Sequence, residues 1–132
     1  MRFTLLIIIC IYALNLSAQS SSSLKIANKY ANSKQCDKAN EIYKTLEAKV
    51  NIMSYYSNYL KCLTAEEKYN TAIALVKKVK KKYPNQAKYI ADLGFIYKAK
   101  EDIVRAKKEW QKSIDAIESG RINQVTSLAN SF

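Results

Sequence analysis

Residues 90–110 read I-A-D-L-G-F-I-Y-K-A-K-E-D-I-V-R-A-K-K-E-W, and this stretch decides the fold of the chain. Ile90, Leu93, Gly94 and Tyr97 stand at positions i, i+3, i+4 and i+7, which gathers them on one face of a helix. A glycine inside a helix costs about 1 kcal/mol relative to alanine, so close approach of a second helix is expected at Gly94. The stretch therefore predicts a helical hairpin.

An alanine recurs along the chain at a nearly constant interval. Ala39, Ala72 and Ala106 follow one another with almost equal spacing. A self-similar unit of this length is typical of stacked helical hairpins and not of one globular core. The chain has only two glycines and one proline, and no segment alternates apolar and polar residues as a half-buried strand does. We therefore predict an all-α fold, with helical hairpins stacked in an α-solenoid.

The core of each predicted hairpin combines bulky side chains with small residues that let two helices approach. The first helix of the first hairpin is expected to bury Ile26, and the second helix of the third hairpin to bury Ile103, Ile114 and Ile117. The expected repeat core consists of Tyr30, Ala39, Tyr43, Tyr59, Ala72, Leu93, Gly94, Tyr97, Ala106 and Trp110.

Local signals predict where helices begin and end. Pro84 should stop the helix before it, and Asn85 is placed to cap the next helix. The run Thr64-Ala65-Glu66-Glu67 has the form of a capping box that begins a second helix. Glu101-Asp102 should open another second helix, where carboxylates favour the helix dipole. Gly120 should end that helix.

These residues resemble the tetratricopeptide repeat, over about residues 20–120. The chain departs from the repeat at Ile90, where tryptophan is usual, and at Leu60, which replaces a glycine. The resemblance implies a right-handed superhelix whose first helices line a concave groove. It also implies that the chain binds peptides or partner proteins in that groove and scaffolds assemblies.

The predicted groove takes its side chains from the first helix of each hairpin. Lysines and asparagines there would hold an extended acidic or C-terminal segment, with Phe95 as the apolar anchor. Some family members clamp a chaperone's terminal carboxylate with such residues. Asp92 reverses a charge expected for that clamp, so that specific function is rejected and a general peptide groove is retained. The predicted groove residues are Asn28, Asn58, Lys61, Lys88, Phe95 and Lys98.

The ends of the chain predict export. Residues 1–18 have a positive start, an apolar run over 3–14 and a small residue, Ala18, before the expected cut. An uncleaved anchor is the alternative, but crossing a membrane takes about 20 apolar residues. We therefore expect a periplasmic or secreted protein without a transmembrane span after signal removal. The remaining segments are a polar leader (19–23), three hairpins (24–120) and a tail (121–132) that either caps the stack or begins a truncated fourth unit.

The formal charge of +11 is most concentrated in a basic patch. The patch is expected on an outer, convex surface. There it either binds anionic polymer or stays solvated near a helix C-terminus, where cations are favoured. No arginine fork or ladder of aromatic residues accompanies it, so nucleic acid is not the expected partner. The patch consists of Lys77, Lys78, Lys80, Lys81 and Lys82.

Two cysteines, Cys36 and Cys62, remain after removal of the signal, which takes Cys10 with it. Neighbouring hairpins bring the regions of the two thiols close together. They either form a disulfide or stay as small apolar residues of the interior. Two cysteines alone do not form a zinc site, so no metal is expected.

Residue types that support catalysis are scarce. The sequence has no histidine, no glycine-rich phosphate loop and no nucleophile elbow. Neither an enzyme nor a cofactor is therefore expected. We predict a non-catalytic adaptor or scaffold that binds a protein or peptide. Two alternatives stay open: a structural segment that self-associates end to end, and an electrostatic binder of anionic polymer through the lysines.

Overall fold

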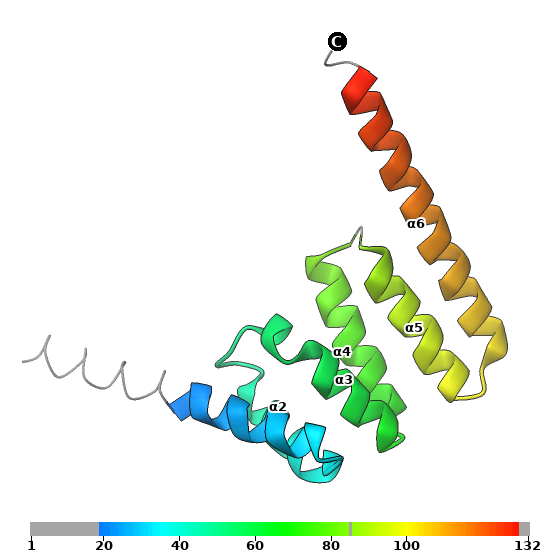
Figure 1. Cartoon of the computed structure of the whole chain (residues 1–132). Helices are drawn as coiled ribbons and strands as arrows, with labels where there is room; N and C mark the ends of the chain where they lie inside the picture. Colours follow the sequence, from blue (N-terminus) through cyan, green and yellow to red (C-terminus); the bar gives the residue numbers. More distant parts are fainter. Residues whose placement is uncertain (1–18, 85, 130–132) are drawn as a thin grey trace, which may run out of the picture. The chain divides into compact units, whose positions relative to one another are not determined.

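The computed structural model describes residues 19–84 and 86–129, and every regular element in these ranges is helical (Figure 1). The all-α prediction is confirmed. The chain divides into two compact units, an N-terminal unit that ends at Glu66 and a C-terminal unit that begins at Glu67. The predicted signal and the predicted cap Asn85 lie outside the described residues. None of the described helices is long and apolar enough to cross a membrane.

The N-terminal unit begins, in its described part, with a helix over 19–32 that buries Ala27. Next along the chain are α2, the short 3-10 helix η1 and α3. The helix α3 packs against α2 and also contacts η1. The bounds of these elements are Cys36–Leu46 for α2, Ile52–Ser54 for η1 and Tyr56–Ala65 for α3.

Three buried tyrosine rings fill the centre of this unit. Tyr43 of α2 stacks on Tyr55 with 5.5 Å between ring centroids, and Tyr59 of α3 lies 5.2 Å from Tyr43. Such aromatic pairs contribute about 0.5–1.5 kcal/mol beyond the burial of their area. Burial, aided by the charge of Glu47, raises the pKa of Tyr55 to about 12. Burial, the charge of Glu47, the neighbouring Tyr55 and a hydrogen bond to Glu47 raise the pKa of Tyr59 to about 12.

We expect Tyr55 and Tyr59 to titrate near pH 12 in the folded protein, whereas exposed tyrosines titrate near pH ~10. The folded state then holds these two protons more tightly than the unfolded chain. The contribution of the protonated tyrosines to the free energy of unfolding is therefore complete below pH ~10, and it is lost as the pH rises toward the pKa values of the folded state. Tyrosinate absorbance, followed together with helical circular dichroism, measures this. A single titration phase near pH ~10 with the helices intact would contradict this prediction. In Tyr55→Phe and Tyr59→Phe variants, the titration phase at high pH should become smaller.

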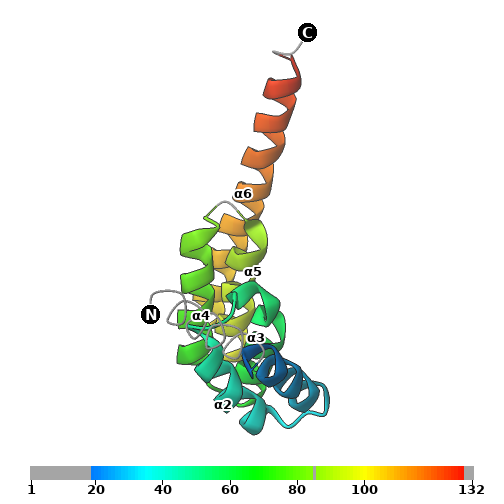
Figure 2. The same ribbon diagram turned by 90° about the vertical axis from the view of Figure 1, so that its left-hand side faces the viewer.

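The C-terminal unit is described as three successive helices. The middle helix, α5, packs against α4 on one side and α6 on the other (Figure 1, Figure 2). α6 is the longest of the three and continues past the end of α5 in both views. The bounds of these helices are Tyr69–Lys82 for α4, Ala87–Ala99 for α5 and Ile103–Ala129 for α6. Thus α4 ends just before Pro84, as predicted.

The three loops that precede α2, α4 and α6 share one backbone feature. Lys34, Glu67 and Glu101 each have a positive φ, between 54° and 63°, and they follow one another with the same spacing as the alanines. In the first and third of these loops, the next amide also bonds to a carbonyl five residues back, at 2.9 Å. This is the Schellman arrangement, which usually employs glycine. The backbone conformation therefore repeats together with the sequence.

The three periodic alanines occupy equivalent places. Ala39, Ala72 and Ala106 are fully buried, and each donates its amide to the carbonyl of the residue just before its helix, at 3.0–3.1 Å. Seven of the ten predicted core residues are buried, whereas Tyr30, Tyr97 and Trp110 are partly exposed. Buried residues that the sequence pattern missed include Asn40, Tyr55, Leu75 and Ser113.

Gly94 marks a close contact between α5 and α6. A Cβ atom built there would meet Trp110, with the indole Cε2 at 2.9 Å and two other ring atoms nearer still. The predicted close approach is therefore confirmed, and the contact is made by the Trp110 ring. Nearby, the Ser113 hydroxyl donates a hydrogen bond to the carbonyl of Ala87 at 2.9 Å, which is a second contact between α6 and α5.

The predicted capping box at Thr64 is wrong. Thr64 lies in the last turn of α3, and its hydroxyl donates to the carbonyls of Leu60 and Lys61 at 3.0 and 2.9 Å. A threonine hydroxyl bonded inside its own helix does not cap a following one. The next helix begins only at Tyr69, after Glu67 has turned the chain.

The prediction that Gly120 ends a helix is also wrong. α6 runs through Gly120 without a break, so residues 121–129 extend this helix instead of forming a separate one. Gly120 has no positive φ, and no neighbouring atom lies within 4 Å of a Cβ built there. Asp102, by contrast, opens α6 as predicted, because its Oδ1 accepts the Arg105 amide at 3.0 Å.

Four isoleucines predicted to be buried are about half exposed. Ile26 is 46% exposed, and the other three range from 47% to 50%. Among the side chains of α6 that the structure describes, Ala106 is buried as predicted, and Ser113 is buried as well. The prediction failed because α6 carries more apolar positions than α5 covers. The other three isoleucines are Ile103, Ile114 and Ile117.

Candidate functional site

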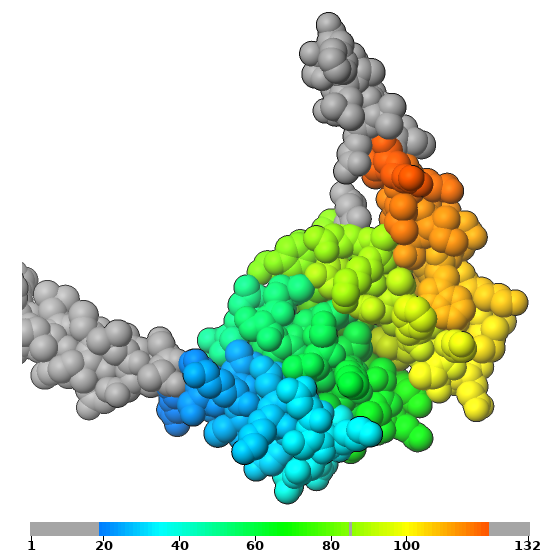
Figure 3. Space-filling model, in the orientation of Figure 1, coloured from blue at the N-terminus to red at the C-terminus, as the bar shows by residue number. Residues whose placement is uncertain are grey.

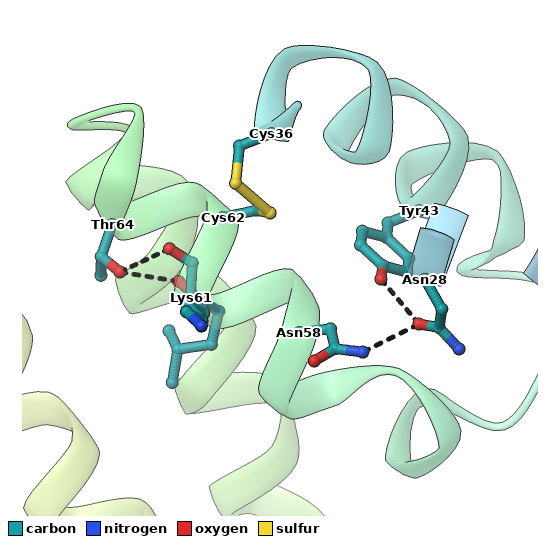
Figure 4. Close-up of a disulfide and its surroundings, with 8 residues drawn as sticks. Asn28, Cys36, Tyr43, Asn58, Lys61, Cys62 and Thr64 are labelled. Carbon is teal, nitrogen blue, oxygen red and sulfur yellow. Dashed lines mark hydrogen bonds between the residues drawn. A yellow bond between two sulfur atoms is a disulfide. The ribbon is translucent and has the colours of Figure 1, made fainter. Parts of the chain in front are cut away.

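Two predicted groove residues bind each other. The side-chain oxygen of Asn28 accepts hydrogen bonds from the Tyr43 hydroxyl at 2.7 Å and from the Asn58 amide at 3.0 Å (Figure 4). These residues belong to the helix over 19–32, to α2 and to α3, so the network ties three helices together. Both asparagines are partly buried. A ligand held by these amides would first have to break the network, which gives them a structural role in the N-terminal unit.

A disulfide joins Cys36 at the start of α2 to Cys62 in α3 (Figure 4). The Cα atoms lie 4.9 Å apart, and both cysteines are buried. The structure thus confirms the bridged alternative for these thiols. Lys61, the neighbour of Cys62 and another predicted groove residue, is exposed on α3.

The remaining predicted groove residues share the exposed face of α5. Phe95 is 62% exposed, and it is the one exposed aromatic residue among the described side chains. Lys98 is exposed one turn further along the helix. Lys88 lies two turns before Phe95 and forms an ion pair with Asp92 at 3.2 Å. The structure therefore brings Lys88, Phe95 and Lys98 together on one side of the helix.

α6 adds a stripe of half-exposed apolar side chains beside Phe95. Trp110 lies edge-on to Phe95, with 5.6 Å between ring centroids and 64° between ring planes. The three half-exposed isoleucines of α6 share the side of the helix that carries Trp110, since their spacings follow the helical period. The resulting surface, here named the α5–α6 face, consists of Phe95, Lys98, Ile103, Trp110, Ile114 and Ile117.

The α5–α6 face was only partly predictable. Periodic isoleucines favour a core position, so the sequence pattern assigned the stripe on α6 to the interior and missed its exposure. One signal in the sequence could have indicated this exposure: the α6 segment has more apolar positions than a single neighbouring helix can cover. In the space-filling view, α5 (yellow-green to yellow) and α6 (yellow to orange) form neighbouring bands of the surface (Figure 3).

Two carboxylates of the C-terminal unit, one on α5 and one at the start of α6, are already engaged. Asp92 pairs with Lys88. Asp102 accepts from the backbone amide of Arg105, and chiefly this bond lowers the pKa of Asp102, so the carboxylate is charged at neutral pH. Lys98 remains exposed at the end of α5. The face therefore combines an apolar centre with positive charge at its edge.

The predicted basic patch divides between two surroundings. Lys77, Lys80 and Lys81 line a pocket together with residues of α5 and α6. Lys78 and Lys82 do not line it, and Lys82 lies over the Tyr83 ring at 5.7 Å. Three of the five lysines thus line a local pocket, whereas the prediction that the patch lies on the convex side of a superhelix stays a prediction.

The described part of the chain has no grouping of side chains suited to a metal ion. No group of three or more histidine, cysteine, aspartate or glutamate side chains there could hold a metal ion. Both cysteines within it are joined in the disulfide.

Comparison with known proteins adds no relative. No protein-family model matches the chain, and no curated protein shows significant similarity to it. A function must therefore be inferred from the residues and the geometry of the chain itself.

Proposed function

We propose that the chain is a non-catalytic adaptor of the tetratricopeptide type, exported from the cytoplasm, which binds a partner protein through the α5–α6 face. The observation that carries the proposal is the exposure of Phe95 beside the half-exposed isoleucines of α6. Soluble proteins rarely expose contiguous apolar patches without a binding role. Aromatic anchors near the centre of such patches supply much of the binding energy in protein interfaces.

The repeat architecture has support at two levels. Three buried alanines and three left-handed loop residues recur along the chain with the same, nearly constant spacing. The Gly94–Trp110 contact supplies the close helix approach that the repeat requires in its last hairpin. Arrays of such hairpins leave an apolar side on their last unit, which a cap or a partner covers.

The geometry favours an amphipathic helix as the bound segment. The apolar positions on α6 extend from Ile103 to Ile117, about 21 Å along the helix axis. A partner helix laid along this line would contact the stripe with side chains at its own helical spacing. Lys98 at the edge favours acidic residues beside that apolar stripe, since opposite charges set orientation and raise the association rate.

The disulfide supports a location outside the cytoplasm. Disulfides persist in oxidising compartments and are rare where glutathione and thioredoxin keep thiols reduced. The bridged pair Cys36–Cys62 agrees with the export signal expected from residues 1–18.

The test is affinity capture from a cell-envelope extract with the chain from residue 19 onward, followed by mass spectrometry. We expect one partner protein to be retained by the native chain, and its affinity to fall at least about tenfold in a Phe95→Ser/Ile114→Ser variant, because the anchor and the stripe are lost together. The measurement is the dissociation constant of the purified partner for each protein.

The matched control is Val104→Ser. Val104 is also on α6 and is 81% exposed, but it lies off the stripe. This variant should bind like the native chain. Equal affinity of all three proteins for the partner, with helical content unchanged, would remove the α5–α6 face as the binding surface.

A further inference from the structure

A second concave site lies in the C-terminal unit, formed by α4, α5, α6 and Pro84, which is two residues past the end of α4. It is a pocket of about 510 Å³, within the range of small-molecule sites. Leu93 and Tyr97 of α5 line it, one turn apart, on a side of the helix different from that of Phe95. The pocket is therefore separate from the α5–α6 face. Its lining residues are Lys77, Lys80, Lys81, Pro84, Leu93, Tyr97, Glu109 and Lys112.

The pocket has a strong excess of positive charge. Four lysines and one glutamate line it, a net formal charge of +3. Glu109 is only 13% exposed; its Oε1 pairs with Lys112 at 2.5 Å, and its Oε2 is buried without a hydrogen-bond partner among the described residues. The excess charge therefore comes from the other three lysines. In the described part of the chain, no hydrogen bond or ion pair is formed by Lys77, Lys80 or Lys81.

Like charges that share a pocket repel one another, and an anion bound among them reduces that repulsion. Two like charges at 4 Å repel by about 1 kcal/mol in bulk water and by about 4 kcal/mol near a protein surface. The C-terminal end of α4 contributes roughly half a negative charge, which the lysines outweigh. A ligand of charge −2 would be attracted by lysines of both α4 and α6.

The type of cation indicates the type of anion. Every cation in the lining is a lysine. Planar carboxylates are matched best by the fork of arginine, whereas the lysine ammonium binds phosphate as a point charge. The lining also includes Pro84, Leu93 and Tyr97, which suit an apolar or aromatic body. We infer that this pocket binds a phosphomonoester, with the phosphate among the lysines and its organic part against Tyr97 and Leu93.

Calorimetric titration with phenyl phosphate tests the inference directly. Phenyl phosphate should bind more tightly than inorganic phosphate, because only the former uses the apolar wall. Affinity should fall as the ionic strength rises, since exposed charges are screened beyond about 10 Å at 0.1 M salt. In a Lys77→Ala/Lys81→Ala variant the affinity should drop at least about tenfold, through the loss of two of the four cations.

The same run of sequence offers a matched control. Lys78→Ala/Lys82→Ala removes the same charge at the same spacing from the same helix, but neither residue lines the pocket. This variant should retain affinity within about twofold of the native chain. An equal loss in both variants would show a general effect of net charge and overturn the assignment of a site, as would absence of binding by the native chain. All four lysines are on the surface of a helix, and thermal melts of both variants confirm folding.

A lipid is a second source of phosphomonoester, and vesicles containing phosphatidic acid distinguish it from a soluble ligand. Binding of phenyl phosphate but not of vesicles indicates a soluble ligand. Vesicle binding that is lost in Lys77→Ala/Lys81→Ala and kept in Lys78→Ala/Lys82→Ala indicates a lipid headgroup in the same pocket. Vesicle binding that both variants weaken equally, without binding of phenyl phosphate, excludes the pocket. None of these outcomes depends on a partner at the α5–α6 face.

Discussion

Replacing both Cys36 and Cys62 with alanine is expected to lower the free energy of unfolding of the N-terminal unit by about 3 kcal/mol. The bridge spans 26 residues of sequence and joins the start of α2 to α3. In the unfolded chain it closes a loop of this length, which removes conformations that the reduced chain recovers. Both residues are buried, and alanine introduces no polar atom at either position. Chemical denaturation of the native and double-alanine proteins measures the difference.

Reduction of the native chain provides the control for this prediction. Dithiothreitol should move the denaturation midpoint of the native protein toward that of the double-alanine variant and leave the variant itself unchanged. Equal stability of the oxidised and reduced native protein would contradict the expected role of the bridge. A loss confined to the alanine variant would instead indicate damage to side-chain packing at Cys62.

Features that depend on local spacing could be predicted from the sequence. Helix content, the stop at Pro84 and the cap at Asp102 follow from neighbouring residues. The alanine interval was equally readable, because a site where two helices meet admits only a small side chain. The same reasoning predicted the contact at Gly94, although the sequence could not show that the Trp110 ring makes it.

Features that depend on the choice between two equally suitable partners could not be predicted. Asn28 and Asn58 have the chemistry to hold a ligand. In the fold, however, Asn28 accepts hydrogen bonds from the Tyr43 hydroxyl and from the Asn58 amide. Lys77 and Lys112 are far apart in the sequence, so their shared pocket depends on the packing of α4, α5 and α6.

The hairpin turns were hidden for a different reason. Lys34, Glu67 and Glu101 adopt a left-handed conformation that sequence reasoning assigns to glycine, at a cost of about 1–2 kcal/mol each. A chain with two glycines has no such signal at these three turns. The structure therefore shows that tertiary packing outweighs local preference at each turn.

Replacing Gly94 with alanine is expected to destabilise the C-terminal unit by about 2 kcal/mol, although alanine is the better helix former. The added methyl group would overlap the Trp110 indole, which cannot retreat without leaving its contact with Phe95. Gly120→Ala is the matched control, because it makes the same change inside a helix where no atom lies within 4 Å. This control should stabilise the protein by up to about 1 kcal/mol, so the two substitutions should have opposite signs in thermal denaturation.

A double-mutant cycle with Trp110→Ala separates the steric contact from helix propensity. Without the indole, Gly94→Ala has only its propensity gain left and should stabilise the variant by up to about 1 kcal/mol. The sign of the Gly94 effect should thus reverse with the side chain at position 110, a coupling of about 3 kcal/mol between two residues in direct contact. If Gly94→Ala had the same effect on stability in both backgrounds, glycine would be needed at this position for its backbone conformation. The absence of a positive φ at Gly94 argues against that requirement, and leaves the Trp110 ring as the reason that this position has no side chain.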